Sequence, residues 1–68
     1  MADPVYKKIQ LVGTSTESFS EAAANAVAKA AETLRNLSWF EVVEQRGSIV
    51  DGKIGQFQVT VSIGFRVE

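Results

Sequence analysis

Residues 54–67 alternate between apolar and polar or small side chains over almost their whole length, and this pattern constrains the fold more than any other feature. One set is entirely apolar: Phe57, Val59, Val61, Ile63, Phe65 and Val67. The other set is polar or small: Gln56, Gln58, Thr60, Ser62, Gly64 and Arg66. Successive side chains of a strand point to opposite faces. We therefore expect a long strand with one face buried under another layer and one open face.

The helix that supplies this layer is predicted after Ser18, where Ser18 and Glu21 form a capping-box pattern. Apolar residues then recur at spacings of three and four for about five helical turns. This predicted core stripe consists of Phe19, Ala23, Ala26, Val27, Ala30, Leu34 and Leu37. Further alanines, including Ala22 and Ala24, lie outside it. They have two explanations of about equal weight: close approach of the helix backbone to a neighbour, or simple helix propensity.

Two more strands complete the predicted fold. Residues 5–12 form the first, which the segment Gly13-Thr14-Ser15-Thr16 ends, and residues 39–50 form the second. Asp51-Gly52 predicts a tight hairpin into the last strand. With that last strand in the centre, every pairing is antiparallel. We thus expect a single α+β domain over residues 1–68, with β-α-β-β order and a three-stranded antiparallel sheet partly wrapped around one helix.

Trp39, the one tryptophan of the chain, is predicted on the face turned away from the helix. Phe40 and Val42 face the helix, while Trp39, Glu41 and Val43 point the other way. Covering an exposed indole is worth roughly 4 to 6 kcal/mol if ~150–250 Å² leaves water. A ligand or another subunit should therefore cover it.

The small size of the chain also indicates that a ligand or another subunit stabilises it. A domain of 68 residues has a marginal core, and a small open sheet exposes two edge strands. The chain has no cysteine and no histidine, which excludes disulfides, thiolate ligands and imidazole chemistry. Oligomerisation or a bound ligand remains as the stabilising element, and a closed symmetric assembly would also cover the edges.

Charge and hydropathy exclude several classes of partner. The net charge is −1, from seven basic and eight acidic residues scattered along the chain, so we expect no nucleic-acid binding. No apolar run approaches the ~20 residues of a membrane span, and residues 1–4 lack a signal-peptide pattern. We expect a cytoplasmic protein. No recognisable catalytic set occurs, so we expect no enzymatic activity.

Trp39 and Gln58 are the pair with the clearest chemistry, because both are predicted on the open face. An indole offers a stacking surface, and a glutamine amide can match the edge of a heteroaromatic ring that alternates N–H and C=O groups. The competing interpretation is that Trp39 fills a subunit interface, and pattern alone favours it about two to one.

Two charged sets have weaker functional interpretations. Lys7, Lys8 and Arg66 can hold a phosphate or an acidic side chain if the first and last strands pair, although edge lysines usually serve solubility. At a subunit junction, oxygen ligands for a hard cation could come from Glu17, Glu41, Glu44 and Asp51. These residues match no calcium-loop spacing, and solvated carboxylates are the preferred interpretation.

The sequence resembles the dodecins, small flavin-binding proteins that assemble into hollow dodecamers. The resemblance covers nearly the whole chain and rests on several short segments taken together. They are Lys7-Lys8-Ile9, Leu11-Val12-Gly13-Thr14-Ser15, Trp39-Phe40-Glu41-Val42, Gln45-Arg46-Gly47, Phe57-Gln58-Val59 and Gly64-Phe65-Arg66-Val67-Glu68. The resemblance implies a hollow homododecamer in which Trp39 stacks on the flavin ring and Gln58 bonds to its pyrimidine edge. Two flavins then lie between symmetry-related tryptophans, in pockets built across subunit contacts.

Arg46 before Gly47 resembles the bacterial branch of the family, where an arginine lies close to the flavin. The candidate flavin site is thus Trp39, Gln58, Arg46 and Glu41, and the expected ligand is FMN or riboflavin, with FMN favoured by the guanidinium. Pairing of Arg46 with Glu44 or Glu41 between subunits is an equally weighted alternative. The resemblance also implies coenzyme A at a subunit junction, for which Lys7, Lys8 and Arg66 are the candidates.

The role that the resemblance implies is flavin storage, with the photochemistry of the flavin quenched by the indole. The alternative is a structural oligomeric shell that binds coenzyme A, metal ions or protein without a flavin role.

Overall fold

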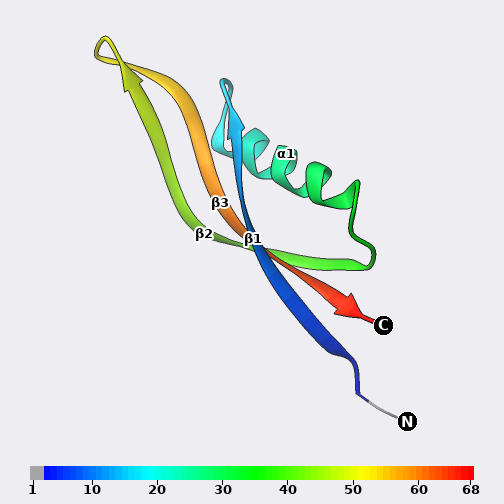
Figure 1. Cartoon of the computed structure of the whole chain (residues 1–68). Coiled ribbons are helices and arrows are strands. Elements are labelled where there is room, and N and C mark those ends of the chain that lie inside the picture. The colour runs from blue at the N-terminus through cyan, green and yellow to red at the C-terminus, as the bar shows by residue number, and fades with distance from the viewer. Residues whose placement is uncertain (1–2) are drawn as a thin grey trace.

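The computed structural model describes residues 3–68, so part of the segment in which no signal peptide was predicted, Met1 and Ala2, lies outside the described residues. The elements are β1 (Val5–Ser15), α1 (Phe19–Ala31), β2 (Leu37–Val50) and β3 (Lys53–Val67) (Figure 1). The sheet order is β1-β3-β2 and both pairings are antiparallel. The predicted β-α-β-β fold with a central last strand is confirmed.

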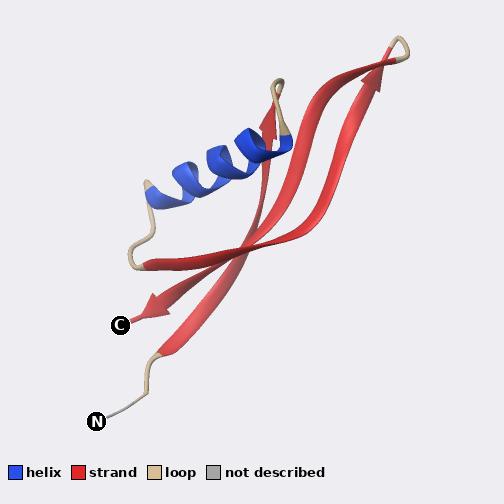
Figure 2. Cartoon of the chain, turned by 180° about the vertical axis from the view of Figure 1, so that it is seen from behind, coloured by secondary structure: helices blue, strands red, loops and turns tan. Residues whose placement is uncertain are grey.

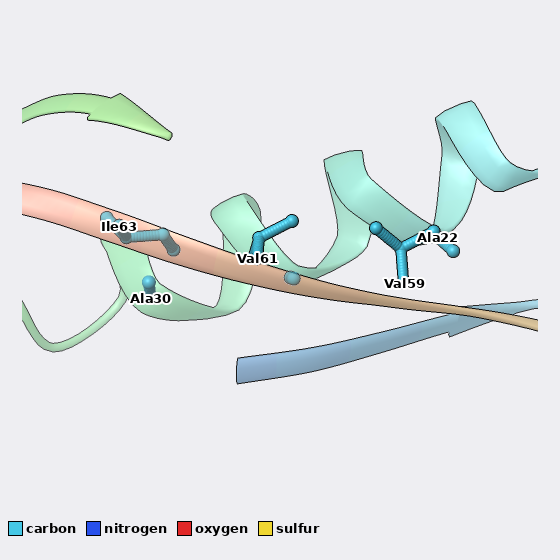
Figure 3. Close-up of a cluster of buried hydrophobic side chains, with 6 residues drawn as sticks. Ala22, Ala30, Val59, Val61 and Ile63 are labelled. Carbon is cyan, nitrogen blue, oxygen red and sulfur yellow. The ribbon is translucent and has the colours of Figure 1, made fainter. Parts of the chain in front are cut away.

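The core lies between α1 and one face of β3 (Figures 2 and 3). Its buried members are Ala22, Ala26, Ala30, Val59, Val61 and Ile63. The helix therefore covers the middle of the apolar face of β3, as predicted, while Val67 at its end is 46% exposed. Half of this buried set is alanine, so the core removes little apolar area from water, and the stability that the chain draws from it is correspondingly small.

The helix differs from the prediction in its length and in its buried face. It ends at Ala31, because the amides of Glu32, Thr33 and Leu34 complete the last turn and Asn36 adopts a positive φ of 62°. Leu34 and Leu37 still pack on the core, although neither belongs to the helix. Leu34 lies in the loop after α1 and Leu37 begins β2, yet both keep the three- and four-residue spacing that predicted further helical turns.

Ala22, predicted outside the core stripe, is completely buried. The reason is the close approach of α1 to β1. A Cβ atom on Gly13 would lie 1.9 Å from the carbonyl oxygen of Ala22 and 2.8 Å from Cβ of Ala26. Of the two explanations for the alanine content, the structure shows the close approach of the helix backbone to a neighbour.

β1 does not end at Val12, because Gly13, Thr14 and Ser15 pair with Val59, Gln58 and Phe57. The turn to the helix begins only after Ser15, whose buried side-chain oxygen accepts hydrogen bonds from the amides of Glu17 (2.9 Å) and Ser18 (3.4 Å). Ser18 caps α1 by accepting from the amide of Glu21 at 3.0 Å. The predicted cap is confirmed, but Ser15 takes the bond to the Ser18 amide that a capping box assigns to Glu21.

β2 and β3 form a hairpin that projects beyond α1 (Figure 1). Asp51 and Gly52 have φ values of 52° and 75°, as the predicted hairpin turn requires. A β-bulge interrupts β2, because Val42 pairs with Val61 but Glu44 pairs with Thr60. The alternation had placed Val43 on the face of Trp39. Instead, Glu44 takes the position opposite Thr60, and the faces of the following β2 residues are exchanged as far as Ser48, where the register shifts again.

Candidate functional site

The sheet face turned away from α1, here called the open face, carries most of the predicted site residues. β3 contributes Gln58, Thr60, Ser62, Gly64 and Arg66 to it. The register places Tyr6, Lys8, Gln10, Val12 and Thr14 of β1 beside them on one side. On the other side it places Trp39, Glu41, Glu44 and Arg46 of β2. Trp39, Glu41, Arg46 and Gln58 therefore share one face.

Trp39 lies directly against the backbone of β3. It pairs with Gly64, and a Cβ atom on that glycine would lie 2.3 Å from both Cε2 and Cζ2 of the indole. The ring of Tyr6, on the far strand β1, approaches the indole with a centroid distance of 5.0 Å and an interplanar angle of 59°. Trp39 remains 40% exposed, so the indole rests on Gly64 and keeps an accessible surface. That surface can stack against a planar molecule.

Gln58 and Arg46 form a second group on the open face. Arg46 Nε donates to Gln58 Oε1 at 2.7 Å, and Gln58 Nε2 donates to Gln56 Oε1 at 3.0 Å. The carboxylate of Glu44 lies 4.0 Å from Arg46 Nη1. These contacts fix the orientation of the Gln58 amide. The bulge in β2 is what places Arg46 here, since unbroken alternation would have put it on the helix side.

Glu41 lies in neither group, because its carboxylate forms an ion pair with Lys8 Nζ at 3.0 Å. Glu44 and Glu41 were considered as partners of Arg46 between subunits, and within a single chain it is Glu44 that lies near the guanidinium. The Lys8–Glu41 pair spans the sheet from β1 to β2, over β3, and both side chains are 55% exposed.

The predicted basic patch is divided between the two faces of the sheet, because Lys8 and Arg66 lie on the open face and Lys7 does not. Lys7 pairs with Phe65, so it lies on the helix side, whereas Lys8 is on the open face and pairs with Gly64. Consecutive residues of a strand cannot share a face, and this separates the two lysines. Arg66 lines a surface cavity of about 510 Å³ that also includes Asn36 and Glu68.

Trp39 and Gln58 are far apart within one chain, although both lie on the open face. Trp39 pairs with Gly64, six positions along β3 from Gln58. At about 3.3 Å per residue this amounts to roughly 20 Å along the strand. One chain thus presents two separate half-sites, one aromatic and one polar, and a single planar ligand cannot contact both within the chain.

An apolar groove on the helix side was not predicted. It has a volume of about 590 Å³ and lies between α1 and β2. Its lining includes Phe19, Ala23, Val27, Phe40, Val42 and Val59. Phe40 and Val42 are 52% and 48% exposed, because α1 packs mainly on β1 and β3. The sequence placed these residues on the helix side correctly, but a single helix over β1 and β3 leaves this part of β2 uncovered.

Among residues 3–68, no group of three or more His, Cys, Asp and Glu side chains comes close enough to hold a metal ion. The four acidic residues considered as cation ligands are dispersed accordingly, with Asp51 at the hairpin turn and Glu17 before α1. In the same part of the chain, the helix is too short and too polar to cross a membrane.

The chain is similar to known proteins over nearly its full length. The family model described as Dodecin matches residues 5–68. A dodecin of Thermus thermophilus is 50% identical over 64 residues, which cover 94% of this chain and 93% of that protein. The structure of the Streptomyces davaonensis dodecin is 45% identical, with a TM-score of 0.94 and 98% coverage of each chain. A calcium dodecin of Mycobacterium tuberculosis, described with a novel calcium-binding site, is 32% identical, with a TM-score of 0.83 and coverage of 94% and 91%. The chain therefore belongs to the dodecin family.

Proposed function

We propose that this protein binds and stores flavin, with the indole of Trp39 as the stacking surface, and that it acts without catalytic turnover. Dodecins are binding and storage proteins. The observation that carries the proposal is the indole itself, which lies on Gly64 and remains 40% exposed on a mostly polar sheet face. An indole held in this way can stack on a flavin ring and quench its excited state by donating an electron.

The residues of the open face fit such a ligand. The exposed indole surface suits a planar ring, and the Gln58 amide is held in one orientation by Arg46 and Gln56. One Nε2 hydrogen of Gln58 is used by Gln56, which leaves a second donor for the polar edge of a ring. Arg46 adds a positive charge beside this edge.

The two half-sites support an assembled site. Because Trp39 and Gln58 lie roughly 20 Å apart in one chain, a ligand that contacts both must lie between copies. We propose that the assembly is the hollow homododecamer of the family, with residues 1–68 as one domain. The apolar groove between α1 and β2 supports association, since exposed apolar surface of this kind marks contact sites.

FMN or riboflavin is the proposed ligand, and the position of Arg46 favours the phosphorylated form. Coenzyme A binding draws on fewer of the predicted residues, because Lys7 lies on the other face and Lys8 is paired with Glu41. Arg66, beside the cavity at Asn36, is the remaining candidate for a phosphate contact there.

A flavin-fluorescence titration tests the proposal. Assembled protein is added to riboflavin and to FMN in parallel, and we expect strong saturable quenching with a break near one flavin per chain. Trp39→Ala should assemble but bind weakly and leave the fluorescence high. Trp39→Phe is the matched control, because it keeps an aromatic surface with a poorer electron donor. Bound flavin that stays quenched in Trp39→Ala would contradict the role of the indole.

A second candidate function is a shell that binds cations, and the calcium dodecin of Mycobacterium tuberculosis favours it. Glu41 and Glu44 on the open face could then supply oxygen ligands from several copies, which is compatible with the lack of a metal-binding cluster within residues 3–68 of one chain. Calorimetric titration of the assembled protein with Ca²⁺ separates the two functions. Calcium binding without any effect of flavin would favour the shell.

A further inference from the structure

Tyr6 and Trp39 come from the two outer strands of the sheet, yet their rings are in contact. Adjacent strands lie about 4.8 Å apart, so β1 and β2 are separated by roughly 10 Å across β3. The two rings meet with centroids 5.0 Å apart because β3 places Gly64, without a side chain, beneath the indole. A side chain at that position would lie between the two rings and keep them apart.

The strand register shows which sides of the indole are covered and which side stays accessible. The row that contains Lys8, Gly64 and Trp39 lies between the row of Tyr6 and the row of Glu41. The Gly64 backbone covers the inner face of the indole, and Tyr6 meets the indole on the side of its own row. On the side of the other row, the Lys8–Glu41 ion pair crosses the sheet. The outer face of the indole is the surface that remains for a ligand.

Tyr6 has no part in the folding core that would explain its contact. It is 43% exposed, and it belongs neither to the buried cluster under α1 nor to the residues packed around it. Its ring meets the indole at 59°, which is a tilted arrangement typical of favourable aromatic pairs. The contact therefore acts on the orientation of Trp39 and contributes little to the burial of the core.

We infer that Tyr6 is a positioning residue that holds the Trp39 indole flat on Gly64 and so prepares its outer face for stacking. The inference rests on the proposed flavin-binding function. A side chain already fixed in its bound orientation loses less conformational freedom on binding. An aromatic pair of this kind contributes an increment that corresponds to about a 2- to 10-fold change in affinity.

The test compares Tyr6→Leu, which keeps apolar area but removes the ring, with Tyr6→Phe, which keeps the ring. Val12→Ala is the control, because Val12 is an exposed apolar residue on the same strand and the same face, level with Thr60. The first readout needs no ligand. Trp39 is the one tryptophan, so time-resolved emission anisotropy under selective indole excitation reports its mobility directly. The second readout is the flavin-fluorescence titration.

In Tyr6→Leu we expect a larger fast component of the anisotropy decay, since side-chain rotamer motion occurs within nanoseconds. Flavin affinity should fall about 2- to 10-fold. Tyr6→Phe should keep both the anisotropy decay and the flavin affinity close to those of the parent protein, and Val12→Ala should leave both unchanged.

Unchanged anisotropy in Tyr6→Leu would overturn the inference, as would equal loss of affinity in Tyr6→Phe and Tyr6→Leu. If Tyr6→Leu fails to assemble, the anisotropy of a double variant that carries Tyr6→Phe and Lys8→Met shows which contact restricts the indole. If the indole is as restricted in that protein as in the parent, the aromatic ring at position 6 holds it. If the indole becomes mobile, the Lys8–Glu41 ion pair is what holds it. Failure of the parent protein to quench flavin would refute the proposed function, whereas the anisotropy comparison would still decide the role of Tyr6.

Discussion

Replacement of Gly64 by alanine tests whether the strand backbone is the support of the indole. The added Cβ atom would lie 2.3 Å from Cε2 and Cζ2 of Trp39 and 2.7 Å from Cδ2. Ordinary carbon contacts are about 3.5–4.0 Å, so the indole must move outward by roughly 1.5 Å. Overpacking of this kind costs about 1–3 kcal/mol. The reduced backbone freedom of alanine in a strand returns about 0.5–1 kcal/mol.

The effect should depend on the indole. In the Trp39→Ala background nothing opposes the new Cβ atom, so Gly64→Ala should stabilise the protein by about 0.5–1 kcal/mol. With Trp39 present, the same change should lower the free energy of unfolding by up to about 2 kcal/mol. The coupling energy of this double-mutant cycle is therefore about 1–3 kcal/mol.

The assay is urea unfolding followed by far-ultraviolet circular dichroism, whose signal comes mainly from the backbone and can therefore be followed in the Trp39→Ala background. All four proteins are measured at one protein concentration, because association makes apparent stability depend on concentration. Gly55→Ala serves as the control, since its neighbours are Ser48 and Val50 and it should behave alike in both backgrounds. A coupling energy below about 0.5 kcal/mol would refute the reasoning, because independent sites add within that margin.

Three further changes have defined outcomes. Gly13→Ala should lower the free energy of unfolding by about 1–3 kcal/mol, since its Cβ atom would overlap the carbonyl oxygen of Ala22; an unchanged urea midpoint would show that the helix can move away. Arg46→Lys should weaken FMN binding more than riboflavin binding if the guanidinium contacts phosphate. Equal loss for both ligands in parallel titrations would instead assign Arg46 to the orientation of Gln58. Lys8→Met should change the free energy of unfolding, measured by urea titration, by no more than about 1 kcal/mol, because both partners of its ion pair are 55% exposed.

The alternation of residues 54–67 was sufficient to predict the central strand, its covered face and the antiparallel topology. It succeeded because the pairing of β3 with β1 keeps one register from Val5 to Ser15. The hairpin turn was equally accessible, since Asp51 and Gly52 are residue types that tolerate positive φ. Local chemistry and long-range packing agree in these segments, and the prediction needed no tertiary information.

The bulge in β2 could not be read from the sequence, because Val43 is a strong strand former that fits an unbroken alternation. The exchange of faces after it depends on how β2 follows the curvature of β3, which is a tertiary property. Arg46 was therefore proposed for the site by family resemblance alone, and the structure supplies the reason why it reaches Gln58. The contact of Tyr6 with Trp39 was missed for a similar reason, since it requires a glycine on a third strand between them. The predictions of flavin binding, of the homododecamer and of a cytoplasmic location remain to be tested.

The separation of the two half-sites links ligand binding to assembly. A chain on its own offers a ligand either the indole or the Gln58 amide, so the proposed complete site exists only in the associated protein. A ligand that binds only this form stabilises it by RT ln(1 + [L]/Kd), which is about 2.7 kcal/mol at a hundredfold excess over Kd. Because half of the buried core of one chain is alanine, such an increment is a large fraction of its stability. Flavin should therefore raise the urea midpoint of the parent protein and leave that of Trp39→Ala almost unchanged. An equal rise in both proteins would mean that the ligand binds away from the indole.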